Sequence, residues 1–346
     1  MMRYVILLFL FINSSINAQI VIKNSKFNEP IPFVHFYDVN SNLILSSDIN
    51  GIVSKEDIKK IYLDNILKLY INHPFFSSKE ILFSELNSAE LKLDPLINQL
   101  NEVVVFNKEY KYIKISAYYR YLVERDNSIY FFVTGIYDFY FNKKMELKKT
   151  KIVSEKKFRN KSNILLDRGA INISLSYSPQ IDNLVSFSEL SRQYRMETDK
   201  NSILLKEKNE ENTVGYIHKN NEISLTLNKI SEKKPLKAQM FGIEIITLNE
   251  TIFSSYNENT FFENISLSNL SYYTKISNFK IKRKREEKYK LFFEKNEIFV
   301  ESITYVNKID TNKEIKSTNW TNIKNPFYQE LPTPIEIFIK NNLEEL

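Results

Sequence analysis

Two long runs of aromatic and β-branched residues, separated by a short polar break, constrain the fold of this chain most. Residues 110–123 (YKYIKISAYYRYLV) and 129–141 (IYFFVTGIYDFYF) flank Asp126-Asn127-Ser128. Aromatic and β-branched residues favour strands, while Asp and Asn favour turns, so the pattern predicts a β-hairpin. Both faces of the second run are largely apolar, so we expect that strand to be central in a sheet and covered on both sides.

Shorter runs of the same kind follow and predict a sequential antiparallel meander. The further strand candidates are residues 203–207, 213–218, 222–227, 238–247, 271–284, 289–293, 298–306 and 313–320. Polar turns are expected at Lys219-Asn220-Asn221 and Lys295-Asn296-Glu297. The charged residues 143–161 are expected to form one more strand and a loop.

Two segments have helical periodicity. Leu184, Phe187 and Tyr194 within residues 178–196 repeat near 3.6 residues, and so do Ile335 and Ile339 within a terminal helix over residues 334–345. Trp320 is expected to pack where the last strand meets that helix. The sequence therefore predicts a mainly β protein, with a small N-terminal β-sandwich followed by a larger antiparallel meander and one or two helices. The meander can remain a curved sheet or half-barrel, or close into a barrel.

The first 18 residues have the layout of a secretory signal peptide. A short positive end (MMR) precedes the apolar core YVILLFLFI and the small polar stretch NSSINA, so we expect cleavage after Ala18. The apolar core is shorter than the roughly 20 residues that a spanning helix needs, and charges interrupt every later apolar run. We therefore expect an exported protein without a transmembrane helix, located in the periplasm or associated with the outer membrane. A buried N-terminal strand or helix is the alternative interpretation.

Residues 19–106 resemble a known family. The residues that carry the resemblance are Pro30-Ile31-Pro32-Phe33-Val34, Ser47-Asp48-Ile49-Asn50-Gly51, residues 67–75, Leu91-Lys92-Leu93 and Leu100-Asn101-Glu102-Val103-Val104-Val105. They look like the carboxypeptidase regulatory-like domain, a module common at the start of exported Gram-negative envelope proteins. The resemblance implies a seven-stranded, prealbumin-like β-sandwich without a peptidase centre.

Two positions depart from that family's pattern. Val53 stands where Phe is common, and His73-Pro74-Phe75 replaces the usual Gly-Tyr, so the local turn must differ. We expect residues 107–346 to form a separate β-rich domain of unknown function.

Composition excludes most recognisable enzyme sites. The chain has no Cys, 3 His and 5 scattered Gly, which leaves no thiolate nucleophile and no glycine-rich phosphate loop. His35, His73 and His218 lie far apart in sequence, and no zinc-binding motif is present. We expect no catalytic residues, no cofactor and no metal.

The charge balance admits two interpretations. The formal net charge is +6, and the densest basic run is Lys280, Lys282, Arg283, Lys284 and Arg285. This run is either a solvated strand edge or turn, or a contact for anionic lipid head groups or phosphate. No nucleic-acid motif is present, and we expect no nucleic-acid partner. A sheet of membrane-spanning strands is disfavoured because four consecutive charges, at 282–285, break any lipid-facing stripe.

Five residues of the predicted hairpin are candidate ligand-binding groups. Tyr118, Tyr119 and Tyr121 could line a groove for a carbohydrate or lipid, although packing within the sheet is the simpler expectation. Asp138 lies in an apolar strand and therefore needs a partner, for which Arg120 is the candidate.

Three functions are compatible with these observations. The first is a non-catalytic envelope accessory protein that binds an envelope protein or outer-membrane component. The second is a periplasmic carrier of a lipid or other hydrophobic ligand, whose order of elements is similar to the half-barrel of bacterial lipoprotein carriers. The third is a glycan or peptide hydrolase.

Overall fold

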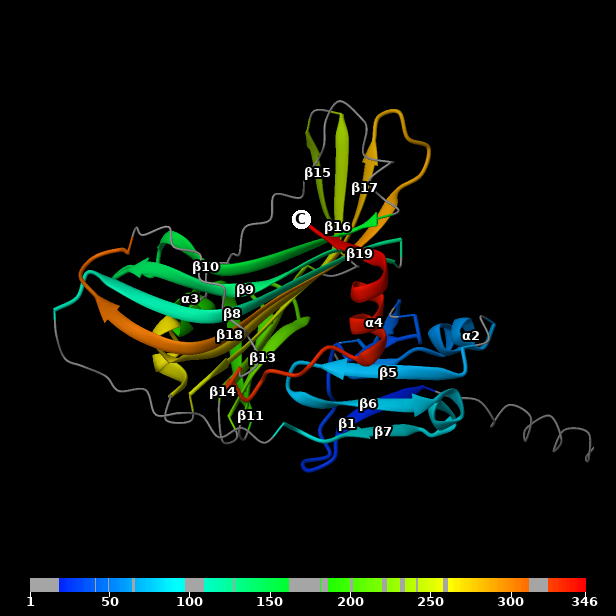
Figure 1. Ribbon diagram of the computed structural model, residues 1–346. Coiled ribbons are helices and arrows are strands. Elements are labelled where there is room, and N and C mark those ends of the chain that lie inside the picture. Colours follow the sequence, from blue (N-terminus) through cyan, green and yellow to red (C-terminus); the bar gives the residue numbers. More distant parts are fainter. Residues whose placement is uncertain are drawn as a thin grey trace, which may run out of the picture. The chain divides into compact units, whose positions relative to one another are not determined.

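The computed structural model describes two units within the chain (Figure 1). The described residues are 19–40, 42–48, 50–63, 66–96, 109–126, 128–161, 181, 186–199, 202–219, 223–230, 234–240, 242–257, 261–310 and 323–346. The division falls between Leu96 and Ile97, a little before the boundary expected at residue 106. The expected signal peptide, residues 100–105 of the family resemblance, the strand at 313–320 and Trp320 lie outside the described residues.

The first unit contains two small sheets. The three-stranded sheet has the order β4 (Ile52–Val53), β1 (Ile20–Asn24) and β7 (Glu90–Leu93), with β1 and β7 parallel. The four-stranded sheet has the order β3 (Leu43–Ser46), β2 (His35–Tyr37), β5 (Lys68–His73) and β6 (Phe76–Leu82). Side chains of both sheets, such as Ile22 and Phe36, share one hydrophobic core, as expected for a small sandwich.

The turn before β4 explains why this unit needs a glycine. The Asp48 carboxylate accepts the backbone N–H groups of Asn50 at 2.9 Å and Ile52 at 2.7 Å. Gly51 has a φ of +71°, and a Cβ at this position would lie 2.8 Å from the carbonyl oxygen of Ile31. Because L-residues rarely adopt this φ, the turn favours glycine.

Three local features of the first unit differ from the sequence expectation. Helix α2 (Lys55–Leu63) and the 3₁₀ turn η1 (Phe83–Asn87) were not predicted. The run of β-branched and aromatic residues at 31–39 predicts one strand, but only His35–Tyr37 forms β2, because Phe33 has a φ of +54° and interrupts the extended chain before it. His73 ends β5, and its Nδ1 accepts the backbone N–H of Phe75 at 3.1 Å, which organises the turn that contains Pro74.

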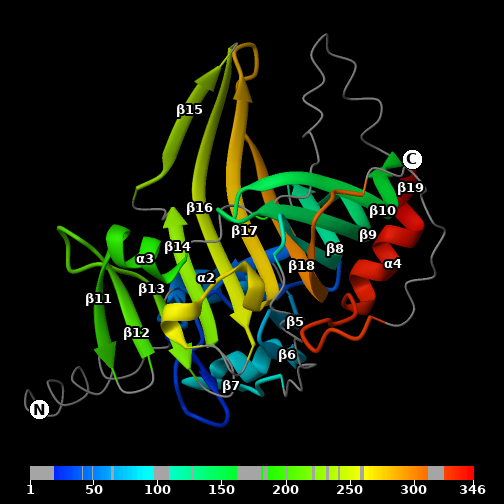
Figure 2. The same ribbon diagram turned by 90° about the vertical axis from the view of Figure 1, so that its left-hand side faces the viewer.

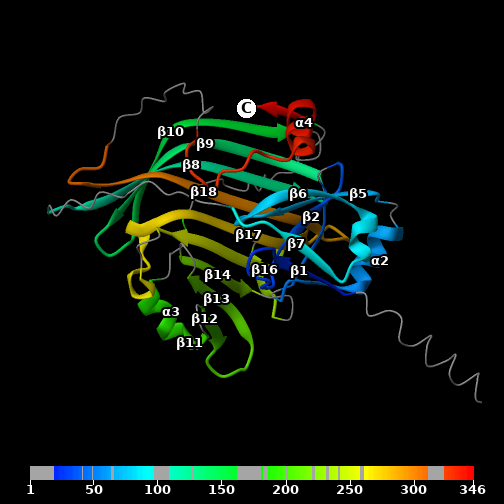
Figure 3. The ribbon, with the colours of Figure 1, turned by 90° about the horizontal axis from the view of Figure 1, so that it is seen from below.

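The described part of the second unit is built on one antiparallel sheet of 12 strands (Figures 2 and 3). The order is β11-β12-β13-β14-β16-β17-β18-β8-β9-β10-β19, with β15 paired to β16, so the sheet is open. The strands are β8 (Tyr112–Arg125), β9 (Ser128–Asn142), β10 (Leu147–Asn160), β11 (Tyr194–Asp199), β12 (Ser202–Glu207), β13 (Thr213–Lys219), β14 (Ile223–Ile230), β15 (Leu236–Met240), β16 (Ile243–Tyr256), β17 (Leu270–Arg283), β18 (Lys290–Val306) and β19 (Leu343–Glu345).

The central hairpin is confirmed. Strands β8 and β9 pair along their length and are joined at Asp126, which has a φ of +49°. Strand β9 lies between β8 and β10 and is mostly buried on both faces.

Two strand assignments were wrong. The triplet Lys295-Asn296-Glu297, expected as a turn, lies in the middle of β18, where each residue pairs with β8 and β17. The single strand expected over 238–247 is two strands, β15 and β16, because Gly242 turns the chain with a φ of +76°.

Opposite faces of the large sheet are covered differently. The inner face is here the face covered by α3 (Phe187–Gln193), η3 (Phe262–Asn264) and η4 (Leu267–Asn269). Its core includes Ile115, Tyr119 and Tyr137 from the hairpin, together with Leu190 of α3 and Leu267 of η4. The helix expected within 178–196 is present as the shorter α3, and its Leu184 lies outside the described residues.

The outer face carries the C-terminal segment. Residues 323–332, here called the strap, precede α4 (Thr333–Asn342), which contacts β9. The expected terminal helix ends at Asn342 and not at residue 345, because Leu343–Glu345 form β19 and pair with Phe158–Asn160 of β10. The last residues of the chain therefore complete one edge of the sheet.

Candidate functional site

The five residues singled out from the sequence are divided between the two faces of the sheet. Alternation along β8 places Tyr119 and Tyr121 in the inner core, whereas Tyr118 and Arg120 lie on the outer face. All four side chains are buried, and so is Asp138 on β9. The tyrosines therefore pack within the protein and do not line one common groove.

Arg120 belongs to a buried charge cluster on the outer face. Its Nε donates to Glu297 Oε2 at 2.6 Å. The other carboxylate oxygen of Glu297 accepts the Tyr272 hydroxyl at 3.1 Å and lies 3.0 Å from the ammonium of Lys295. Two cations thus share one carboxylate, and the tyrosine hydroxyl completes its hydrogen bonding.

Burial and mutual charge act in opposite directions on the pKa of each group in this cluster. Burial alone raises the pKa of Glu297, but the charges of Arg120 and Lys295 outweigh it and bring the pKa down to about 2. Burial lowers the pKa of Lys295, and the Glu297 carboxylate opposes that shift only in part. Burial likewise opposes the charge of Arg120, yet pairing with Glu297 leaves the pKa of Arg120 raised.

The expected Asp138–Arg120 pair was wrong. Asp138 accepts a hydrogen bond from Ser116 at 2.6 Å and forms an ion pair with Lys114 at 2.9 Å. The β8–β9 register explains the difference, because it pairs Asp138 with Ser116 and Arg120 with Thr134. Asp138 and Arg120 share a face but lie opposite different partners.

The strap seals the charge cluster from outside. The backbone carbonyl of Gln329 accepts Arg120 Nη1 at 2.8 Å. The Phe327 ring stacks on Tyr272 at 5.3 Å between centroids, and Tyr328 meets Tyr118 edge-on at 5.4 Å. Burial raises the pKa of Tyr328 to about 12. These contacts hold the strap against the outer face of the sheet.

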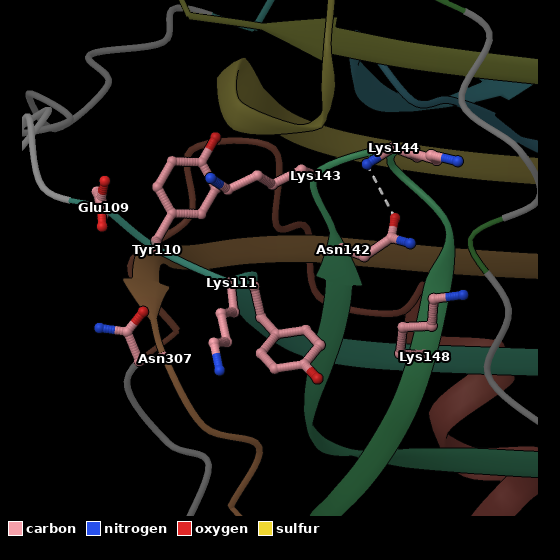
Figure 4. Close-up of a pocket in the computed structure, with 9 residues that line it drawn as sticks. Glu109, Tyr110, Lys111, Asn142, Lys143, Lys144, Lys148 and Asn307 are labelled. Carbon is pink, nitrogen blue, oxygen red and sulfur yellow. Dashed lines mark hydrogen bonds between the residues drawn. The ribbon is translucent and has the colours of Figure 1, made fainter.

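An open pocket lies where β8 begins, β9 ends and β18 ends. Its volume is about 690 Å³, and Figure 4 shows the side chains around it. The lining residues are Glu109, Tyr110, Lys111, Tyr112, Asn142, Lys143, Lys144, Lys148 and Asn307. We call it the lysine pocket, because four of these residues are lysines.

The β9–β10 turn fixes one side of the lysine pocket. Asn142 Oδ1 accepts the backbone N–H groups of Lys144 at 2.9 Å and Glu146 at 3.0 Å, and Met145 has a φ of +62°. The Asn142 amide also donates to the Glu146 carboxylate at 2.9 Å. This network orders the backbone that carries Lys143 and Lys144.

The pocket has an excess of positive charge. Lys148 pairs with Glu146 at 2.7 Å, whereas Lys111, Lys143 and Lys144 form no ion pair within the described ranges. The Lys143 ammonium lies 5.4 Å from the centre of the Tyr110 ring, which is itself 4.6 Å from the Tyr305 ring. Figure 4 shows the lysines spread around the pocket and not gathered at one point. Such an arrangement can bind an extended anion through several groups at once.

Sequence reasoning missed every lysine of this pocket. The residues come from three segments that only strand pairing brings together, namely 109–112, 142–148 and 307. The available signal was the lysine-rich stretch after the second aromatic run, which was interpreted only as a strand and loop.

The described residues show neither a group of metal ligands nor a membrane-spanning helix. Among them, no three His, Asp or Glu side chains converge as metal ligands. His35 and His73 belong to the first unit, and His218 belongs to β13 of the second. No helix in the described part of the chain is both long and apolar enough to cross a membrane.

Comparisons with known proteins add no relative. No family model matches the chain, and neither a curated protein nor a solved structure matches it.

Proposed function

We propose that this chain is an exported, non-catalytic binding protein of the cell envelope, and that its second unit binds an anionic ligand at the lysine pocket. The observation that carries the proposal is the group of three lysines, Lys111, Lys143 and Lys144, that surround an open pocket without forming an ion pair within the described ranges. Exposed cations around a concave surface attract anions and raise their local concentration.

The chemical class of the ligand follows from the spacing and the aromatic residues. Ammonium groups spread around about 690 Å³ suit several anionic groups on one extended molecule better than a single phosphate. Tyr110 and Tyr112 add flat apolar surface beside the cations. A glycan that carries uronic acid or phosphate groups combines these features, and such a ligand would be an envelope component.

The buried carboxylates favour binding over hydrolysis. Glu297 is held by Arg120, Lys295 and Tyr272, while Asp138 is held by Lys114 and Ser116. These carboxylates serve the fold, and the strap covers the first of them. The inner face of the sheet is packed by the protein's own side chains, which favours a ligand on the surface over a lipid carried inside the sheet.

The first unit is part of the same proposal. We infer that it is a carboxypeptidase regulatory-like module, supported by its two sheets around one core and by the Asp48–Gly51 turn. Export is inferred from the first 18 residues alone. N-terminal sequencing of protein recovered from a periplasmic fraction tests it, and a first residue other than Gln19 would count against cleavage after Ala18.

A titration with a defined glycan tests the binding site. The full chain from Gln19 onward is titrated calorimetrically with hexameric oligogalacturonate, and with neutral maltohexaose as the uncharged probe. We expect binding of the acidic probe alone, weakened at higher salt because exposed charges are screened. The triple variant Lys111→Gln/Lys143→Gln/Lys144→Gln should bind at least about tenfold more weakly.

The matched control removes three exposed lysines elsewhere on the second unit. Lys156, Lys208 and Lys340 change to Gln together, so the net charge equals that of the pocket variant. If both triple variants lose affinity for the acidic probe equally, the effect is due to net charge, and the lysine pocket is not the binding site. If maltohexaose binds as tightly as the acidic probe, the proposal that the ligand is anionic is wrong.

A further inference from the structure

A second basic surface lies on an arm that extends from the large sheet. Figures 1 and 2 show β15 and the adjoining ends of β16 and β17 reaching beyond the neighbouring strands. Residues 243–247 of β16 pair only with β15 and β17, because the pairing with β14 begins at Glu250. We call residues 236–240, 242–247 and 279–291 the arm.

The arm has two chemically distinct faces. Cross-strand pairing aligns Ala238, Ile245 and Ile281 on one face. It aligns Gln239, Glu244 and Lys282 on the other, beside Lys237, Ile246 and Lys280. Since side chains alternate along a strand, the first face is mostly apolar and the second is mostly basic and polar, with Ile246 among its cations.

The basic face is ordered around one aromatic ring. The ammonium groups of Lys280 and Lys282 lie 4.8 and 5.4 Å from the centre of the Tyr289 ring. The hydroxyl of Tyr289 donates to Glu244 at 2.8 Å. These contacts fix two cations on one side of the arm, because a cation over an aromatic face is attracted by the ring quadrupole.

The turn at the end of the arm adds further cations. Lys284, Arg285 and Lys288 are exposed and form no ion pair with any described residue. Glu286 of this turn is already engaged, since it pairs with Lys290 at 2.8 Å and accepts the backbone N–H of Arg283 at 2.9 Å. The exposed carboxylate of Glu287 offsets one of these cations, and the remaining positive charge at the turn is available to a partner.

Exposed apolar side chains accompany these cations. Leu236 is 59% exposed and Leu291 is 49% exposed, and they lie on opposite faces of the arm. A polyanion in water does not favour exposed leucines, whereas a bilayer interface accommodates apolar side chains beside basic ones.

We propose that this arm docks on an anionic lipid surface, with Lys284, Arg285 and Lys288 against the head groups and the two leucines at the interface. The arm is separate from the lysine pocket, because β18 begins at Lys290 beside the arm and ends at Val306 beside the pocket. The proposal stands independently of any ligand in that pocket.

Vesicle flotation of the full chain from Gln19 onward tests the proposal. The probes are vesicles of phosphatidylglycerol with phosphatidylethanolamine, and vesicles of phosphatidylcholine alone. We expect flotation with the anionic vesicles only. The turn variant Lys284→Gln/Arg285→Gln/Lys288→Gln should weaken it at least about tenfold, and Leu236→Ser/Leu291→Ser should weaken it severalfold.

The variants distinguish a loss of membrane docking from a loss of folding and from a change in net charge. The three turn side chains form no hydrogen bond, ion pair or ring contact with a described residue, so the turn variant should keep the circular dichroism spectrum of the parent chain. The matched control is again Lys156→Gln/Lys208→Gln/Lys340→Gln. Absence of flotation, or equal flotation of the turn and control variants, overturns the proposal. Full flotation of the leucine variant overturns the role given to Leu236 and Leu291 at the bilayer interface.

Discussion

Arg120 donates from Nε to Glu297 Oε2 at 2.6 Å across the β8–β18 pairing, and the two residues are 177 positions apart in the chain. The guanidinium also lies 5.2 Å from the Phe299 ring and 5.5 Å from the Tyr328 ring. One buried cation therefore connects two strands and the strap, and its only described counter-charge is Glu297.

Removing that counter-charge should destabilise the second unit strongly. Glu297→Gln leaves the buried Arg120 without its described counter-charge and removes an anion from Lys295, which costs about 3–5 kcal/mol in comparable sites. The free energy of unfolding in urea measures it. Replacing the whole cluster, as Arg120→Met/Lys295→Met/Glu297→Leu, should recover most of the loss, and an equally unstable triple variant would contradict this account.

The stabilisation from Glu297 should depend on pH in the acid range. Its pKa is about 2 in the folded protein and 4.5 in the unfolded chain, so its contribution is complete above about pH 4.5 and is lost as the pH falls towards 2. The difference in unfolding free energy between the parent chain and Glu297→Gln should shrink across that window. A constant difference from pH 6 to about 2.5 would show that the carboxylate is not the titrating group.

The strap should loosen when Asn325 is truncated. Its side-chain amide donates to the carbonyls of Ser271 at 2.9 Å and Val300 at 2.7 Å, and its Oδ1 accepts the N–H of Phe327 at 3.0 Å. Asn325→Ala leaves buried backbone groups unpaired and should cost about 1–3 kcal/mol. Hydrogen exchange at the Phe327 amide should accelerate, whereas the exposed Asn342→Ala serves as the control. Unchanged exchange would argue against a strap held by Asn325.

Gly51→Ala should destabilise the first unit more than Gly242→Ala destabilises the second. Both glycines have positive φ, but a Cβ at Gly51 would lie 2.8 Å from a backbone oxygen, whereas one at Gly242 meets nothing closer than 3.7 Å. The strained φ alone costs about 1 kcal/mol, and the clash adds to it only at Gly51. Native-state hydrogen exchange, which reports each unit separately, measures both losses. If both variants lose the same free energy of unfolding, the Cβ clash at Gly51 does not contribute.

The sequence predicted the parts of the fold that local chemistry determines. The aromatic hairpin was confirmed because alternation and an Asp-Asn-Ser break lie within one stretch of chain. Helix α2 was missed although Ser54 and Asp57 carry a capping pattern, in which Asp57 N–H donates to the Ser54 hydroxyl at 3.2 Å.

The residues at the centre of the sheet could not be predicted in the same way. Lys295-Asn296-Glu297 resembles a turn because three polar residues in a row are costly inside a strand. The partner that offsets this cost, Arg120, lies 177 positions away and is invisible to a local pattern. The lysine pocket has the same origin, since its three segments meet only through pairing of β18 with β8 and of β8 with β9.

The strand order also determines how this chain can reach its native state. Strand β8 is the first of the large sheet to be synthesised, yet its neighbour β18 is made after most of the others. During translation the β8–β10 portion and the β11–β17 portion therefore cannot join, and each presents an unpaired edge until β18 arrives. Pairings of such long sequence separation form slowly. Ribosome-bound chains that stop before Lys290 should thus hold two independent half-sheets, prone to mispair, that a single late strand unites.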